Sequence, residues 1–184
     1  EEGWYKKALD TDLARPKFAI MNPEITYTLP DYQTQCGCAD IMMHTMERYF
    51  ELEDTMEITD KIAQDVMKNV MKYAKILKKD PENYEARAEI MWCGSLSHNG
   101  LTGCGTCGGD WATHLIEHEL GGMFDVAHRA GLAAVWGSWA RYVMDEKPER
   151  FAQFAVDVMG VEESDDVKST ALKGIEAVEE FYRM

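Results

Sequence analysis

The sequence predicts a mostly α-helical domain, residues 31–184, that follows a short β segment, residues 1–30. Three observations predict this class. Apolar residues recur at helical spacing through most of the chain after residue 30. Proline and acidic residues stand where helices would begin. Sequence patterns typical of β-strands occur only before residue 30. A length of 184 residues is enough for one domain with a substantial core.

The N-terminal stretch predicts two short strands. Residues 18–21 are apolar and lie between Pro16 and Pro23, and residues 25–28 are rich in β-branched side chains. A strand without a neighbour exposes its apolar face or pairs with another chain. We therefore expect this segment to complete a sheet edge that lies elsewhere.

Helix starts are marked by Pro30 with Asp31, by Asp60 and by Pro81. Gly121-Gly122 predicts a helix end and a turn. The expected helices span residues 32–50, 59–79 and 83–101, a helix that ends at Gly121-Gly122, a helix that opens at His128, and residues 148–159 and 163–184.

Composition excludes several classes of function. The formal net charge of −14 argues against nucleic acid and against anionic membrane surfaces as partners. No run of eighteen apolar residues occurs, so we expect no membrane span. The chain has five cysteines, an odd number, and twelve methionines. This composition fits a reducing cytoplasm better than a secreted disulfide framework.

Histidines and one aspartate suggest a metal site. Asp40 and His44 are four residues apart, as are His114 and His118, so each pair shares a helical face. His128 follows the predicted glycine turn and can return beside the second pair. Imidazoles with one carboxylate suit zinc or ferrous iron, and spacing alone allows both His114 and His118 as ligands. The sequence His-Leu-Ile-Glu-His at residues 114–118 does not match the HExxH motif, which excludes a zinc protease of that type.

These motifs, with His128 followed two residues later by Ala-Gly-Leu-Ala, resemble the iron-containing (group III) alcohol dehydrogenases. Residues 15–20, 22–30 and 110–114 resemble the butanol dehydrogenase branch, and the resemblance covers nearly the whole chain. It implies the helical C-terminal domain of the dehydroquinate synthase-like fold. It also implies Fe²⁺, with Zn²⁺ as an alternative, held by the four residues Asp40, His44, His114 and His128. His118 would then be the unliganded catalytic histidine that faces substrate and nicotinamide.

The resemblance also implies a second domain. Members are roughly twice this length and carry an N-terminal Rossmann-like coenzyme domain with a glycine-rich phosphate loop. No such loop occurs here before residue 94. We therefore expect the chain to be the metal-binding part of a longer protein, without the coenzyme domain and the last helices, and inactive alone. We also expect a homo-oligomer, and no coenzyme-binding residue can be assigned.

The expected reaction is oxidation of a primary alcohol or reduction of an aldehyde with NAD(H) or NADP(H). One alternative is a metal-dependent lyase similar to dehydroquinate synthase, although that family uses Glu where Asp40 stands and its substrate lysines are not evident. Another alternative is a non-catalytic, metal-binding helical fragment.

Other motifs allow two interpretations each. The glycine-rich loop of residues 100–109 is a connection or a phosphate cradle, and it lacks the lysine of a P-loop. Its Cys104 and Cys107 could join Cys36 and Cys38 in a thiolate zinc site. Arg129 stands where the resemblance predicts glycine. Glu117 and Glu119 are expected to face solvent or cap neighbouring groups, and the tryptophans Trp92, Trp111, Trp136 and Trp139 are expected in the core.

Overall fold

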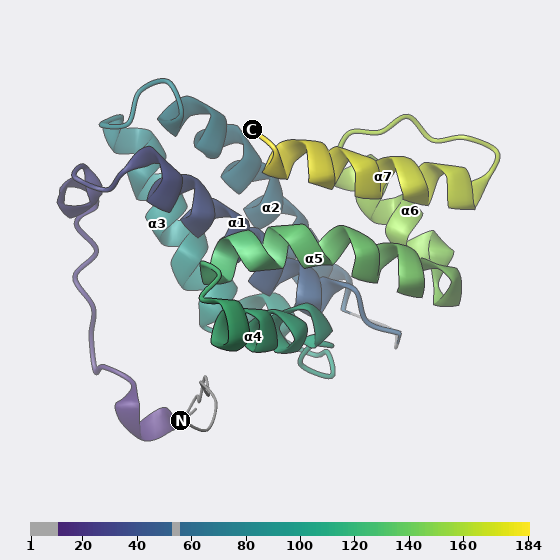
Figure 1. Cartoon of the computed structure of the whole chain (residues 1–184), viewed down its shortest axis with the longest axis horizontal. Coiled ribbons are helices and arrows are strands. Elements are labelled where there is room, and N and C mark those ends of the chain that lie inside the picture. Colours follow the sequence, from purple (N-terminus) through teal and green to yellow (C-terminus); the bar gives the residue numbers. More distant parts are fainter. Residues whose placement is uncertain (1–10, 53–55) are drawn as a thin grey trace.

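The protein is described by a computed structural model that covers residues 11–52 and 56–184. Seven α-helices make up this part of the chain (Figure 1). They are α1 (Asp31–Tyr49), α2 (Glu57–Leu77), α3 (Tyr84–His98), α4 (Ala112–Phe124), α5 (His128–Val143), α6 (Pro148–Asp157) and α7 (Val167–Tyr182). Short 3-10 turns are η1 (Asp12–Ala14), η2 (Pro23–Thr26), η3 (Leu101–Gly103) and η4 (Met144–Glu146). The mostly α-helical prediction is confirmed.

Local signals set most helix boundaries. The Asn83 side chain accepts a hydrogen bond from the N–H of Ala86 and caps α3. Asp166 caps α7 in the same way, through the N–H of Lys168. Pro148 occupies the first turn of α6, where its missing N–H has no helical partner to lose. Side-chain caps and proline therefore account for the starts of three helices, of which α7 begins at Val167 and not at residue 163 as predicted.

The predicted helix end at Gly121-Gly122 is wrong. The helix α4 continues to Phe124, and Asp125 ends it in the left-handed region with φ 54°. The N–H of Asp125 donates to the carbonyl of Gly121, so both glycines lie inside the last helical turn. Aspartate tolerates left-handed backbone better than most side chains, and it takes the role that we assigned to glycine.

The two predicted strands are also wrong: residues 11–30 contain no strand. This segment leaves the helical body as an extended arm (Figure 1). Pro23 opens the 3-10 turn η2, whose first turn is capped by the Asn22 side chain. A strand needs a neighbour for its N–H and C=O groups, and the described chain supplies none. Phe18 and Ile20 consequently lie exposed.

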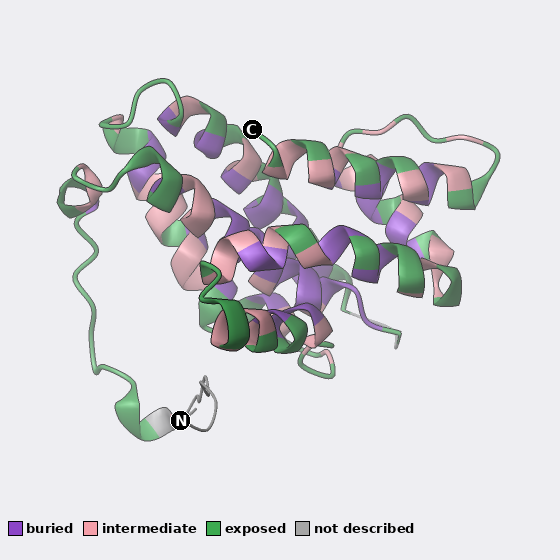
Figure 2. Ribbon diagram, in the orientation of Figure 1, coloured by how far each residue is buried: buried purple, intermediate pink, exposed green. Residues whose placement is uncertain are grey.

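Helix α1 runs through the middle of the fold. It packs against α2, α3 and α5, and α5 in turn packs against α4 and α7. Met42, Met43 and Met46 of α1 are completely buried, in agreement with the purple centre of Figure 2. Flexible thioether chains fill the irregular space between several helices well. Polar residues on a helix so deeply enclosed need partners, which makes Asp40 and Glu47 conspicuous.

A buried ion pair ties α6 to the centre. Two guanidinium nitrogens of Arg150 lie 2.5 and 2.6 Å from the carboxylate oxygens of Asp60 on α2. The same guanidinium covers the ring of Tyr49 at 3.5 Å and donates to the Tyr49 carbonyl. These contacts lock the end of α1 against α2 and α6. No helix in the described part of the chain is long and apolar enough to cross a membrane.

Candidate metal centre

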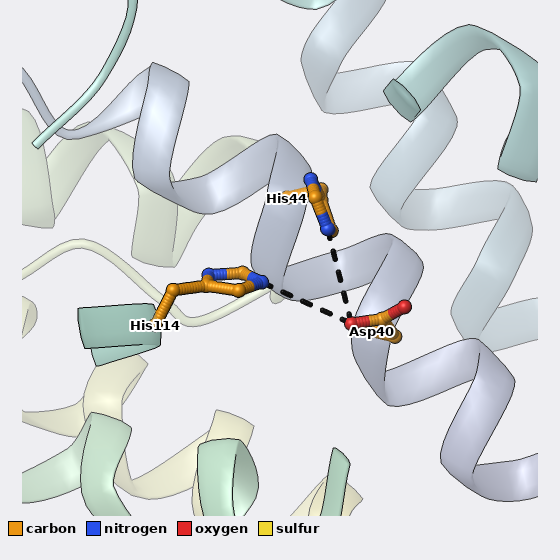
Figure 3. Close-up of side chains that lie close together, drawn as sticks. All are labelled: Asp40, His44 and His114. Atoms are coloured by element: carbon orange, nitrogen blue, oxygen red, sulfur yellow. Dashed lines mark ion pairs between the residues drawn. The ribbon is translucent and has the colours of Figure 1, made fainter. Parts of the chain in front are cut away.

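Three helices bring the predicted ligands to one place. Asp40 and His44 project from consecutive turns of α1, His114 comes from the first turn of α4, and His128 is the first residue of α5. The Nε2 atoms of His44 and His114 each lie 3.9 Å from Oδ1 of Asp40 (Figure 3), and Nε2 of His128 lies 3.8 Å from the same oxygen. One carboxylate oxygen thus faces three imidazole nitrogens.

Two of these atoms are buried without a hydrogen-bond partner, Oδ1 of Asp40 and Nε2 of His114. Buried polar atoms nearly always have a hydrogen-bond partner. Two unpartnered atoms that face each other therefore fit a bound group between them. Three neutral imidazoles and a carboxylate are a common ligand set for zinc or ferrous iron. Around a tetrahedral ion with bonds of about 2.1 Å, ligand atoms stand about 3.4 Å apart. The distances of 3.8–3.9 Å from Oδ1 of Asp40 to the three Nε2 atoms are slightly longer than this spacing.

The protonation states also suit a cation. Burial alone would raise the pKa of Asp40, but His98, His44 and Arg129 outweigh it and lower the pKa to about 2. Burial, aided by the neighbouring His98, lowers the pKa of His44 to about 3. At neutral pH the carboxylate is therefore ionised and the imidazole of His44 is neutral, the forms that coordinate metals.

The second oxygen of Asp40 has different neighbours. Nε of Arg129 lies 3.3 Å from Oδ2, and Nε2 of His98 lies 3.7 Å from it. The His98 ring also lies against the His44 ring, with centroids 3.9 Å apart. Arg129, which stands where the resemblance predicts glycine, therefore engages the outer oxygen and leaves Oδ1 to the histidines.

Two glutamates that we did not predict as site residues contact the histidines. Glu47 of α1 contacts Nδ1 of His114, and Glu117 of α4 contacts Nδ1 of His128. Both glutamates are completely buried, so the expectation that Glu117 faces solvent is wrong. Each stands three residues after a histidine of its own helix, and that repeated His-x-x-Glu spacing was the available signal.

His118 lies beside the cluster. It stands one turn after His114 on α4, and its ring centroid is 6.3 Å from that of His114 and 5.3 Å from that of His128. The set whose ligand atoms all lie within 4.8 Å of one another comprises Asp40, His44 and His114. The predicted ligand His128 lies outside this set and forms a neighbouring one with Glu117 and His118.

The glycine-rich loop is a connection. Its N–H groups at Cys107 and Gly109 donate to the carboxylate of Glu51, at 2.9 and 2.5 Å. An internal carboxylate thus occupies the place that a phosphate would take. Cys104 and Cys107 are exposed thiols, and no metal-type set in the described residues contains a cysteine.

Only some of the tryptophans that we predicted in the core are buried there. Trp136 and Trp139 are buried in the main core, as expected. Trp92 is largely exposed, so the prediction is wrong there. Trp111 lies at the site: its ring approaches His44 and His114 edge-on, with 5.3 Å between centroids in both cases. Its backbone adopts φ 60°, a conformation that non-glycine residues seldom take.

Comparison with known proteins identifies relatives. Residues 34–184 match the family described as Fe-containing alcohol dehydrogenase, C-terminal. NADH-dependent butanol dehydrogenase A of Clostridium acetobutylicum is 35% identical over 178 residues, which are 96% of this chain and 46% of that protein. The NADPH-dependent aldehyde reductase YqhD of Escherichia coli is 34% identical over 161 residues, 88% of this chain and 41% of that protein.

Solved structures agree. The crystal structure of NADH-dependent butanol dehydrogenase A from Thermotoga maritima superposes with a TM-score of 0.90 at 36% identity, over 95% of this chain and 43% of the other. The chain thus spans less than half the length of these relatives. On this evidence the chain belongs to the iron-containing alcohol dehydrogenase family and matches its C-terminal part.

Proposed function

We propose that this chain is the metal-binding part of an NAD(P)H-dependent alcohol dehydrogenase or aldehyde reductase that acts on primary alcohols and aldehydes. The observation that carries the proposal is the convergence of three histidine Nε2 atoms, at 3.8–3.9 Å, on the unpartnered buried oxygen of Asp40. The proposed ligands are Asp40, His44, His114 and His128, and the proposed ion is Fe²⁺ or Zn²⁺.

When bound, such an ion supplies Lewis acidity toward the oxygen of an alcohol or aldehyde. The chain's own residues prepare the place. The ionised Asp40 supplies the negative charge, and the neutral His44 supplies a lone pair. Trp111 packs edge-on against the His44 and His114 rings.

We assign His118 the role of holding or moving a proton near the substrate oxygen. Its ring lies next to the rings of two proposed ligands, His114 and His128. An imidazole in that place can accept and return a proton. The nicotinamide coenzyme carries the hydride, and we assign none of its binding residues to this chain.

Names of the relatives support the reaction class. NADH-dependent butanol dehydrogenases and an NADPH-dependent aldehyde reductase align with 88–96% of this chain. They favour an oxidoreductase over a lyase similar to dehydroquinate synthase. The remaining alternative, a metal-binding fragment with no part in catalysis, is separated by experiment.

Metal analysis of anaerobically purified protein tests the site. We expect about one divalent ion per chain, lost in Asp40→Ala and His128→Ala, because three ligands hold an ion much more weakly than four. His118→Ala should retain the ion. Stoichiometric metal in His128→Ala would contradict the ligand assignment, and loss of metal in His118→Ala would show that His118 is a ligand.

A further inference from the structure

Glu47 and Glu117 are the completely buried acids closest to the proposed ligands, and the proposed reaction has no direct role for either. Each carboxylate contacts the Nδ1 atom of a histidine whose Nε2 faces Asp40. A ring that donates its Nδ1 proton to a carboxylate must present an unprotonated Nε2 on its other side. The contact therefore selects both the tautomer and the direction of the ring.

The pairings run from helix to helix in one direction. Glu47 lies on α1, one turn after His44, and contacts His114 on α4. Glu117 lies on α4, one turn after His114, and contacts His128 on α5. Each helix thus contributes a histidine to the cluster and a glutamate that reaches the histidine of the next helix.

Glu47 serves two groups of α4 at once. Its Oε2 contacts the His114 ring, while its Oε1 accepts the backbone N–H of His114 at 3.1 Å. That N–H lies in the first turn of α4, where no side chain of the capping residue, Trp111, accepts a hydrogen bond. A carboxylate at a helix N-terminus is stabilised by the helix dipole, so Glu47 positions the helix as well as the ring.

Space for Glu117 is provided by a glycine. A Cβ atom at Gly131 of α5 would lie 2.7 Å from Cγ of Glu117 and 3.1 Å from its Oε1. The absence of a side chain there lets the glutamate pass between α4 and α5 to reach His128.

We propose that Glu47 and Glu117 are positioning residues that hold His114 and His128 in the metal-binding tautomer and orientation. The inference rests on the proposed metal site and deepens it. Carboxylates that hydrogen-bond to metal-binding histidines orient the ring and raise its basicity, and their loss weakens metal affinity roughly ten- to hundredfold.

The test measures the affinity of the 184-residue chain for Zn²⁺ by competition with a chromophoric chelator, and the visible spectrum of its Co²⁺ form. We expect Glu47→Gln and Glu117→Gln to weaken Zn²⁺ binding roughly ten- to hundredfold and to alter the Co²⁺ spectrum. Glu179→Gln is the matched control. It also neutralises one carboxylate, which pairs with Arg141 at the far end of α5, and it should leave both readouts unchanged.

A double-variant comparison separates positioning from general stabilisation. His128→Ala does not retain the ion on purification, so its weaker affinity is measured by titration with excess Zn²⁺. In that background Glu117→Gln should weaken binding no further, because the ring that it orients is gone, whereas Glu47→Gln should still weaken it by its full factor. Equal losses from both glutamine variants in that background would overturn the inference. Circular dichroism checks folding, and Glu117→Gln, which removes no helix cap, decides the matter if Glu47→Gln does not fold.

The outcomes distinguish this inference from the proposed function. If the unmodified chain binds Zn²⁺ and both glutamine variants bind it equally well, the positioning role is wrong and the metal site stands. If the unmodified chain binds no divalent ion, the proposed site and the inference are both overturned.

Discussion

At the scale of single residues, Asp40 is a carboxylate with two distinct sides. Oδ1 faces the three histidines, and Oδ2 lies near Arg129 and His98. Cations and donors around the outer oxygen keep the group ionised despite burial, which is why its pKa is lowered to about 2. A buried aspartate held in this way gives a cation one negatively charged ligand throughout the physiological pH range.

His118 carries the first prediction at this scale. In a longer form of the protein that includes a coenzyme domain, His118→Ala should lower turnover roughly ten- to ten-thousandfold, the range for a positioned acid–base group. Metal content should not change, because His118 is not one of the four proposed ligands. The measurement is turnover per bound metal ion. Full activity per ion, together with lower stability, would show that the ring only packs.

At the scale of elements, the close contact of α6 with α7 depends on one small residue. A Cβ atom at Gly174 of α7 would lie 2.5 Å from Cβ and 2.9 Å from Cα of Ala155 on α6. The second of these atoms is backbone, so the contact cannot be relieved by a side-chain rotation. The two helices must move apart to admit even a methyl group.

Gly174→Ala should therefore lower the free energy of unfolding by about 1–3 kcal/mol, the usual cost of overpacking. Gly37→Ala is the matched control, because a Cβ atom at Gly37 in α1 would meet no atom within 4 Å. That change should stabilise the helix by about 0.5–1 kcal/mol through backbone entropy. Urea unfolding of both variants gives the comparison, and two shifts of the same sign would contradict the packing argument.

At the scale of the whole molecule, apolar surface remains uncovered on two parts of the fold. Phe18 and Ile20 are exposed on the N-terminal arm, and Leu115, Met123 and Phe124 are exposed on α4. Side chains of this size are more often buried, and contiguous exposed ones commonly mark interfaces. The relatives reported above are more than twice as long as the matched region.

The corresponding prediction concerns activity. The 184-residue chain loaded with Fe²⁺ or Zn²⁺ should not reduce an aldehyde with NADH or NADPH, because we find no coenzyme-binding motif in it. The same chain joined to the N-terminal half of a butanol dehydrogenase relative should do so. The decrease in absorbance of the reduced coenzyme measures both reactions. Turnover by the 184-residue chain alone would contradict the assignment of coenzyme binding to a separate domain.

Sequence and structure agree most closely where the signal is local. Apolar spacing and helix caps predicted all seven helices, because both act within a few residues. The same short range explains the failures. Strands at residues 18–21 and 25–28 required a partner outside the described chain, and the end of α4 at Asp125 depended on a backbone conformation that Gly121 could equally have taken.

The sequence by itself determined the helical class and the family resemblance. The resemblance named the four candidate ligands, whereas a spacing of four residues only placed His114 and His118 on one helical face and left both as possible ligands. Only the tertiary structure decided that Glu47 and Glu117 are buried against His114 and His128, and that Arg129 turns to the outer oxygen of Asp40. The physical reason is that these contacts join different helices. Their existence depends on how α1, α4 and α5 pack, which no local pattern encodes.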